Sequence, residues 1–157
     1  PIRPLELMLG KLLPSLVVGA VDFALVFAAG LYLFDLTFAG NLPLFLLLSL
    51  LLVLTTLGLG LLISTVSQNQ QQAMQLAMFA MLPQILLSGF IFPLDAMPKA
   101  IKAIAYLLPF THFVPIAQGM FIKGQGLDLL WPQVTVLAAY AVVVVGLATA
   151  RFRKRIA

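Results

Sequence analysis

The sequence predicts an all-α integral membrane protein with four transmembrane helices and a pair of short helices in an outer loop. Two observations predict this fold class: 62% of the 157 residues are hydrophobic against 9% charged, and four apolar stretches are long enough to cross a bilayer. A soluble domain carries about a quarter charged residues, and a chain of this size exposes too much surface to hide so much apolar area from water. The mean hydropathy of +1.12 therefore indicates a chain surrounded by lipid.

The expected spans cover residues 12–34, 43–66, 73–92 and 129–150. Each can cross about 30 Å of hydrocarbon, which takes about 20 helical residues. Pro14 is expected in the opening turn of the first span, where a missing amide hydrogen costs little, and Pro132 opens the fourth. Membrane strands alternate polar and apolar residues, whereas residues 44–54 are apolar at nearly every position, which favours helices.

The distribution of basic residues predicts that both chain ends are cytoplasmic. Six lysines and arginines lie on the side of the chain ends: Arg3, Lys11, Arg151, Arg153, Lys154 and Arg155. Three lie in the long loop on the other side: Lys99, Lys102 and Lys123. Cytoplasmic loops carry the excess of such residues, so the net charge of +4 is interpreted as a topology signal and not as a nucleic-acid site. A contact of the C-terminal cluster with anionic lipid is the secondary interpretation.

The long outer loop is expected to hold two short helices over residues 98–122. The first has Ile101 and Ile104 on one face and Lys99 and Lys102 on another, which is an amphipathic spacing. Both helices are too short to span. They would lie on the outer membrane surface, or dip in and return where protein shields them.

Small residues recur at every fourth position in three of the spans, which predicts close helix contacts in lipid. The helix-packing candidates are Ala20, Ala24, Ala28, Thr56, Gly60 and Ser64, and Gly146 with Ala150 forms a third stripe. The contacts would lie within one subunit or form a dimerisation face, and the sequence leaves both interpretations open.

Four residues are candidates for a translocation path: Asp22, Pro83, Gln84 and His112. Asp22 is the only acidic residue deep in a span, where a lone carboxylate costs at least about 2.5–3.5 kcal/mol and must face protein or water. Its role is either coupling to protons or a cationic substrate, or a structural hydrogen bond. Pro83 interrupts the third span next to Gln84 and is expected to kink it, as a gate or as fixed architecture.

The sequence contains no candidate catalytic, cofactor-binding or metal-binding residues. A single histidine in a chain without cysteine cannot assemble the usual three-ligand zinc site, so His112 is expected to form an interfacial hydrogen bond. No phosphate-binding loop or nucleophile elbow occurs. Any energy for transport must therefore come from a partner or from an ion gradient.

Taken in order, several motifs resemble the C-terminal membrane half of bacterial ABC transporter permeases of the type-2, or exporter, class. They are the opening Pro1–Leu7 with Gly10 and Lys11, Gly58–Ser64, the glutamine-rich turn Gln68–Gln72, Leu87–Pro93, Pro109–Val114, and Lys123–Gly126. Many members carry Arg where Gln118 stands and Tyr where His112 stands, which indicates a subgroup.

This resemblance implies a permease subunit of an ATP-driven exporter in the bacterial inner membrane, with a hydrophobic or amphipathic substrate such as a drug. Residues 2–8 would be a coupling segment seated on a separate ATPase subunit, with Ile2, Arg3, Leu5 and Glu6 as contacts. A second permease chain, identical or not, would complete the pathway. The chain is expected to be a fragment that lacks a first span, an outer domain and a second span.

Three other functions remain open from the residues alone. A gradient-driven secondary carrier could use Asp22, although such carriers usually have more than one intramembrane ionisable group or a pair of broken helices. A membrane enzyme acting on lipid would need a nucleophile and base, and no such pair is evident. A scaffold that only recruits partners fits the same sequence.

Overall fold

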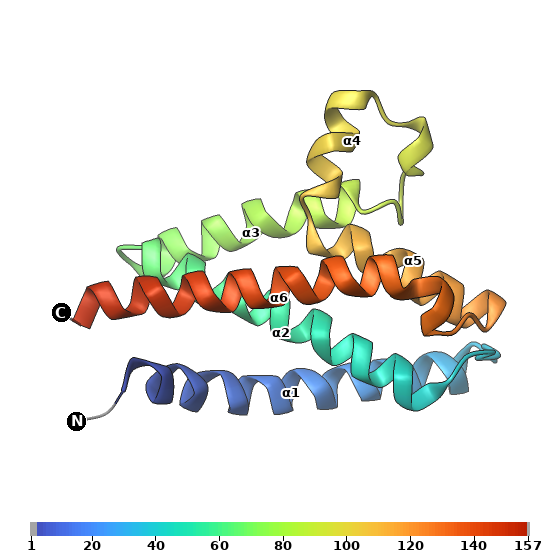
Figure 1. Ribbon diagram of the computed structural model, residues 1–157, viewed down its shortest axis with the longest axis horizontal. Coiled ribbons are helices and arrows are strands. Elements are labelled where there is room, and N and C mark those ends of the chain that lie inside the picture. Colours follow the sequence, from blue (N-terminus) through green and yellow to red (C-terminus); the bar gives the residue numbers. More distant parts are fainter. Residues whose placement is uncertain (1–2, 157) are drawn as a thin grey trace.

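The computed structural model describes residues 3–156, which form six α-helices and one short 3-10 helix and contain no strand (Figure 1). In chain order the elements are α1 (Pro4–Leu33), α2 (Leu42–Val66), α3 (Gln70–Leu87), the 3-10 helix η1 (Leu94–Ala96), α4 (Lys99–Tyr106), α5 (Pro109–Lys123) and α6 (Leu127–Ile156). The predicted all-α fold class is confirmed.

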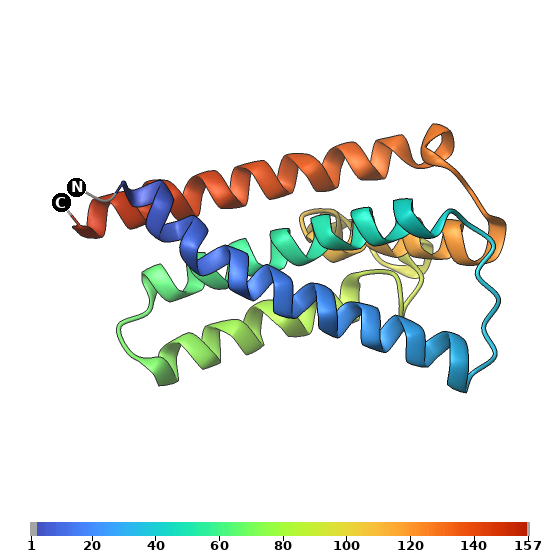
Figure 2. The ribbon, with the colours of Figure 1, turned by 90° about the horizontal axis from the view of Figure 1, so that it is seen from below.

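Helix α2 forms the centre of the bundle. It packs along α6 and α1 and also contacts α5 and α3. The N- and C-termini lie together at one end of the bundle, while the α1–α2 loop and the α5–α6 turn lie at the other (Figures 1 and 2). Two termini on the same side are what an even number of membrane crossings requires.

Three helices are each long and apolar enough to cross a membrane: Leu5–Leu33, Leu42–Val66 and Leu127–Phe152. The pair α4 and α5 meets the same criterion only when taken together, with an 84° bend between the two helices. Helix α3 does not meet it. It ends at Leu87, five residues before the end predicted for the 73–92 span, and its first turn consists of glutamines. The helix therefore ends before residue 92, the end expected for this span.

The first span begins earlier than its sequence predicts. Helix α1 starts at Pro4, where the Glu6 carboxylate accepts a hydrogen bond from the backbone nitrogen of Arg3 at 3.1 Å. Acidic side chains satisfy the free amides of a helix start in this way. Pro14 therefore lies inside the helix and not in its opening turn. The described part of the coupling segment is continuous with the first span.

The fourth span also starts earlier than predicted. Helix α6 begins at Leu127, so Pro132 lies inside the helix, beyond its first turn. Asp128 lies in that first turn, where a carboxylate is favoured by the helix dipole. Pro132 therefore does not open α6, just as Pro14 does not open α1.

An aromatic cluster fixes the end of the bundle opposite the termini. Phe45 of α2 is 2% exposed, and the rings of Phe27 (α1), Phe38 (α1–α2 loop) and Phe121 (α5) lie 5.2 to 5.3 Å from its ring centroid. Offset and edge-on ring pairs at such distances stabilise a core beyond their buried area. The cluster ties α5 to α1 and α2, and so positions one wall of the groove described below.

Two glycines mark where the helices approach most closely. A Cβ atom on Gly58 of α2 would lie 2.8 Å from Cγ1 of Val144 in α6, and one on Gly19 of α1 would lie 2.7 Å from Cγ1 of Val53 in α2. Backbones in lipid approach closely where side chains are absent. Both contacts lie beside the predicted small-residue stripes and not on them.

Candidate functional site: an apolar groove between α2, α3 and α5

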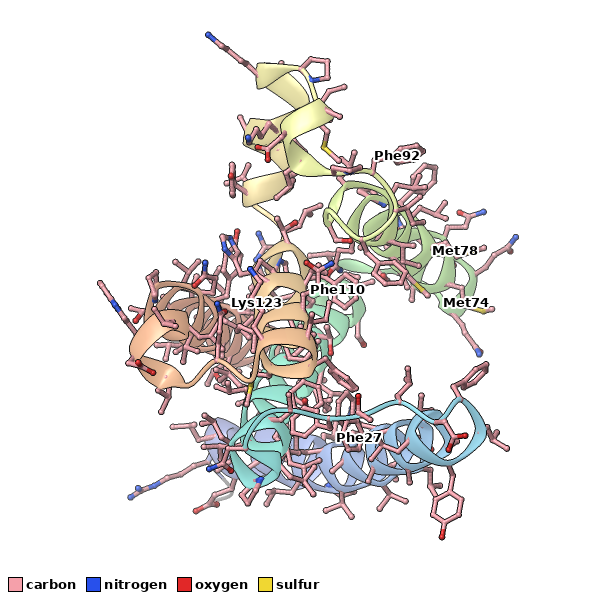
Figure 3. All side chains as sticks on the ribbon, turned by 90° about the vertical axis from the view of Figure 1, so that its right-hand side faces the viewer. Phe27, Met74, Met78, Phe92, Phe110 and Lys123 are labelled. Carbon is pink, nitrogen blue, oxygen red and sulfur yellow. The ribbon has the colours of Figure 1, made fainter. Side chains whose placement is uncertain are left out.

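Helix α3 lies at the periphery of the bundle. It contacts α2, α4 and α5 and contains no buried residue. In Figure 3, which looks along the bundle, α3 with Met74 and Met78 stands apart from α1 with Phe27. The side chains of Met74 and Met78 are 63% and 65% exposed. This arrangement opens the space between α3 and its neighbours.

A cavity of about 340 Å³ lies between α2 and α3. It is lined by Thr56, Leu59, Gly60, Ile63, Ala77, Ala80, Met81, Gln84 and Phe110. Its two polar side chains are turned to their own helices: the Thr56 hydroxyl donates to the Val53 carbonyl at 2.9 Å, and the Gln84 amide donates to the Ala80 carbonyl at 3.3 Å. The walls are therefore apolar in character. The small residues Gly60, Ala77 and Ala80 leave space between the two helices.

A second cavity, of about 250 Å³, continues from the first along α5. It is lined by Phe90, Phe110, Phe113, Val114, Ala117, Gln118, Phe121 and Ile122. Phe110, labelled in Figure 3, lines both cavities, so they adjoin at this ring, and together they are called the groove below. Apolar, aromatic walls with a few amide groups are typical of sites for hydrophobic small molecules.

The end of α3 is built by a tight turn that opens the groove. The Ser88 hydroxyl donates to the Ile85 carbonyl at 3.2 Å and accepts from the Phe90 amide at 3.3 Å. Gly89 follows with φ of +88°, a conformation that side chains disfavour. The turn redirects the chain to η1 and α4, so that α5 can return along α2.

An ion pair lies in the segment between α3 and α5 that contains η1 and α4, called the η1–α4 excursion below. The Lys102 ammonium lies 2.9 Å from Oδ1 of Asp95. The hydrogen bond and charge of Lys102 lower the pKa of the Asp95 carboxyl, and the hydrogen bond that Lys102 donates to Asp95 raises the pKa of Lys102. Both residues lie between the third and fourth predicted spans. The pair links η1 to α4.

Two side chains hold the corner between α4 and α5. The Nε2 atom of His112 lies 2.9 Å from the Tyr106 carbonyl oxygen, and the Tyr140 hydroxyl of α6 donates to the Leu107 carbonyl. The His112 ring lies between the rings of Tyr106 and Tyr140, at centroid distances of 6.2 and 6.0 Å. His112 is thus placed at the corner and not in the groove.

The remaining translocation-path candidates are separated in space. Gln84 lines the groove, and Pro83 lies beside it inside α3. Asp22 is exposed on α1, which does not line the groove. Within residues 3–156 the structure records no hydrogen bond or ion pair for the Asp22 carboxylate.

The helix-packing candidates lie in two places: a small cavity between α1 and α2, and the groove. Ala20 and Ala24 line a cavity of about 160 Å³ between α1 and α2, whereas Ala28 is exposed. Thr56 and Gly60 line the groove, and Ser64 is exposed beyond it.

The ATPase-coupling candidates lie at the end of the bundle that holds both termini. Leu5 is 57% exposed, and Arg3 and Glu6 are exposed and bonded to each other. Ile2 lies outside the described residues. Met8 and Leu12, one and two turns further on, are buried against Ala148 of α6.

Sequence reasoning missed the aromatic wall of the groove. Phe110, Phe113, Ala117 and Phe121 recur at spacings of three or four on α5, which is the pattern of one helix face. That pattern was available in the sequence, but it does not distinguish a buried core face from a groove wall. In the described part of the chain, no three His, Asp or Glu side chains gather closely enough to hold a metal ion.

Comparisons with known proteins identify the family. The profile of the family described as "ABC-2 type transporter" matches residues 1–122. The chain is 38% identical over 152 residues to the "Probable multidrug ABC transporter permease YbhS" of Escherichia coli, covering 96% of this chain and 40% of that protein. It is 32% identical over 160 residues to the "Inner membrane transport permease YhhJ" of Escherichia coli, covering 99% of this chain and 42% of the relative.

A eukaryotic protein is also similar. The "ABC transporter G family member 20" of Dictyostelium discoideum is 29% identical over 126 residues, covering 80% of this chain and 17% of that protein. No solved structure matches the chain. The chain spans about two fifths of the length of its bacterial relatives, and the resemblance noted in the sequence is confirmed. With its membrane-spanning helices and the family profile matching most of its length, the chain belongs to the ABC-2 type transporter family.

Proposed function

We propose that the chain forms part of the membrane domain of an ATP-driven export permease, and that the groove is its share of the translocation path. The observation that carries this proposal is the pair of adjoining cavities, 340 and 250 Å³ in volume, that meet at Phe110. Their apolar and aromatic walls suit a hydrophobic or amphipathic compound such as a drug. The flexible side chain of Met81 in the lining can adapt to compounds of different shape, and two bacterial relatives are named as multidrug permeases.

ATP would be hydrolysed by a separate ATPase subunit, since the bacterial relatives are named as permeases. The first turns of α1 are the coupling surface in this proposal. One face of these turns packs on α6 through Met8, while Leu5, Leu7 and Leu9 are 43 to 57% exposed. Because the segment is continuous with α1, a displacement of the segment by the ATPase would move the whole span as a rigid body.

A second permease chain, identical or different, would close the groove. The outward face of α3 carries Met74, Met78 and Phe79, each more than 60% exposed. In the membrane both chain ends would lie on the cytoplasmic side, where the basic residues concentrate. The membrane is the bacterial inner membrane in this proposal, as the name of one relative states for that protein.

The rival function is a gradient-driven carrier that uses Asp22. Its carboxylate would have to exchange protons or ions with the transported compound, which requires a shared cavity. Asp22 lines none of the groove, and α1 lies on the other side of α2. This separation favours the exporter, while a scaffold without transport remains an outcome of the experiment below.

The test narrows the groove without disturbing the fold. A Cβ atom at Gly60 meets nothing within 4 Å, and the same is true at Gly146 on α6, which lines no cavity described above. Gly60→Leu would place a side chain in the groove, and Gly146→Leu is the matched control. Both variants would be made in the full-length permease, expressed with its ATPase, and efflux of ethidium from cells would be measured.

We expect Gly60→Leu to lower the efflux rate about tenfold or more, and Gly146→Leu to leave it within about twofold, at equal amounts of protein in the membrane. If both variants export at the original rate, the groove is not the path. If the unaltered protein with its ATPase exports no compound of a hydrophobic panel, a scaffold role is favoured.

A further inference from the structure

Asp22 occupies an unusual position in the membrane part of the chain. It lies 11 residues beyond Lys11 and 11 residues before Leu33, so each helix segment is about 16 Å long. Half the hydrocarbon thickness of a bilayer is about 15 Å. No other acidic or basic residue lies inside the four predicted spans. The carboxylate is therefore placed near the middle of the membrane.

The side of α1 that carries Asp22 is uncovered in this chain. Val18, Leu25 and Val26, its neighbours at helical spacing, are 61%, 64% and 73% exposed. The side of the helix that packs on α2, through Gly19 and Phe23, adjoins this uncovered side. Figure 2 shows α1 crossing the near face of the bundle with no other helix in front of it. This face, called the Asp22 face below, has no partner among residues 3–156.

A carboxylate cannot be left facing acyl chains, since charged groups inside the membrane face protein or water and pair with one another. Because the rest of the Asp22 face is apolar, a further membrane helix suits it better than a water-filled path, and an acidic group at this depth pairs best with a basic group on that helix. A second copy of this chain cannot supply it at this depth. All nine of its lysines and arginines lie outside the predicted spans, and its one histidine, His112, is bonded at the α4–α5 corner.

We propose that the Asp22 face seats a further transmembrane helix of the same full-length polypeptide, one that carries Lys, Arg or His at mid-membrane depth and pairs with Asp22. The length of the relatives supports this source. The chain covers 40 to 42% of the bacterial relatives, so more than half of each relative lies outside the aligned region. The inference does not depend on what the groove transports.

The first experiment identifies the occupant by cross-linking. A photo-reactive amino acid would replace Val26, which is 73% exposed on the Asp22 face, or Val142, which is 74% exposed on α6, as the matched control. The full-length permease would be irradiated in native membranes and cross-linked peptides identified by mass spectrometry. We expect Val26 to cross-link to an apolar segment of the same polypeptide that contains a basic residue, and Val142 not to reach that segment.

Three outcomes would overturn the proposal: cross-linking of the Val26 position to a second copy of this region, to a different protein, or to lipid alone. The second experiment then tests the ion pair. Asp22→Lys should lower the amount of permease in the membrane about tenfold by placing two positive charges together. Exchanging the identified basic residue for Asp in the same protein should restore at least half of it, and failure to restore any would refute the pairing.

Discussion

The Nε2 atom of His112 lies 2.9 Å from the carbonyl oxygen of Tyr106, the last residue of α4. Tyr140 donates its hydroxyl to the next carbonyl, that of Leu107. Carbonyls at the end of a helix have no partner within it, and here side chains of α5 and α6 satisfy two of them. The 84° corner between α4 and α5 is thereby tied to α6.

Replacing His112 with Ala should loosen this corner. The Tyr106 carbonyl would lose its donor, and one such hydrogen bond contributes about 0.5–1.5 kcal/mol. We expect the melting temperature in detergent to fall by about 2–4 °C, with Tyr140→Phe giving a similar loss. Gln118→Ala, an exposed change on the same helix, is the control. Equal melting temperatures for His112→Ala and the control would show that the corner is held by other contacts.

The ion pair between Asp95 and Lys102 should give the η1–α4 excursion a broad pH plateau. Because the pair lowers the pKa of Asp95, its contribution is complete above the ordinary aspartate pKa of about 3.9 and is lost as pH falls through the lowered value. Because the pKa of Lys102 is raised, the contribution is complete below about 10.4 and lost as pH rises beyond that. Between these limits the pair is intact.

The measurement is hydrogen exchange of residues 94–99 at pH 7 in low and high salt. The Asp95 side chain is 98% exposed, so salt at about 1 M should screen the pair and speed exchange. Asp95→Asn should exchange fast at both salt concentrations, with Asp128→Asn, outside this segment, as the control. Slow exchange in Asp95→Asn at low salt would show that the pair does not order the excursion.

Gly58 and Gly60 should respond in opposite ways to alanine. A Cβ at Gly58 would lie 2.8 Å from Val144, whose side chain is stiff in a helix, whereas a Cβ at Gly60 meets nothing within 4 Å. Gly58→Ala should destabilise the bundle by about 1–3 kcal/mol, and Gly60→Ala should stabilise it by up to about 1 kcal/mol. Thermal unfolding in detergent measures both.

A second substitution provides the control for this contact. Val144→Ala in the Gly58→Ala protein should recover most of the lost stability, because it removes the clashing methyl group. If the Gly58→Ala and Gly60→Ala proteins have the same melting temperature, the α2 and α6 backbones do not approach closely enough at Gly58 for a methyl group to clash with Val144.

Leu5→Asp should uncouple the permease from its ATPase. Leu5 is 57% exposed on the first turn of α1, and burying a leucine at an interface contributes about 1.5–3 kcal/mol. We expect binding of the ATPase by the full-length permease to weaken about tenfold or more. Leu36→Asp, 49% exposed at the other end of the bundle, should bind normally. Equal binding by both variants would place the ATPase elsewhere.

Composition and span length predicted the fold class because a lipid-exposed segment must satisfy its own backbone, and uninterrupted apolar runs do this as helices. Helix starts were less predictable. Pro14 and Pro132 both suit an opening turn, but the helices begin earlier. Helix α1 begins at Pro4, where the Glu6 carboxylate accepts from the Arg3 amide, and α6 begins at Leu127 with Asp128 in its first turn. The end of α3 was missed because the turn at Gly89 interrupts a run that is apolar throughout.

The candidate site was only partly predictable. Gln84 was singled out as a polar residue in a span, and the groove does contain it. Thr56 and Gly60 were predicted as packing residues, because small residues serve contact and cavity equally well in sequence. Phe110 was missed because an aromatic residue in an apolar segment has no feature that marks it as the point where two cavities meet.

The most direct test of the groove as a translocation path is protection of a single cysteine by a transported compound. The chain contains no cysteine, so Ala80→Cys in the groove and Val142→Cys on α6 give distinct sites in a full-length permease without other cysteines. Labelling by a membrane-permeant maleimide would be followed with and without ethidium. We expect ethidium to slow labelling at position 80 several-fold and to leave labelling at position 142 unchanged. Equal labelling rates at position 80 with and without ethidium, in a protein that exports it, would show that the groove is not the translocation path.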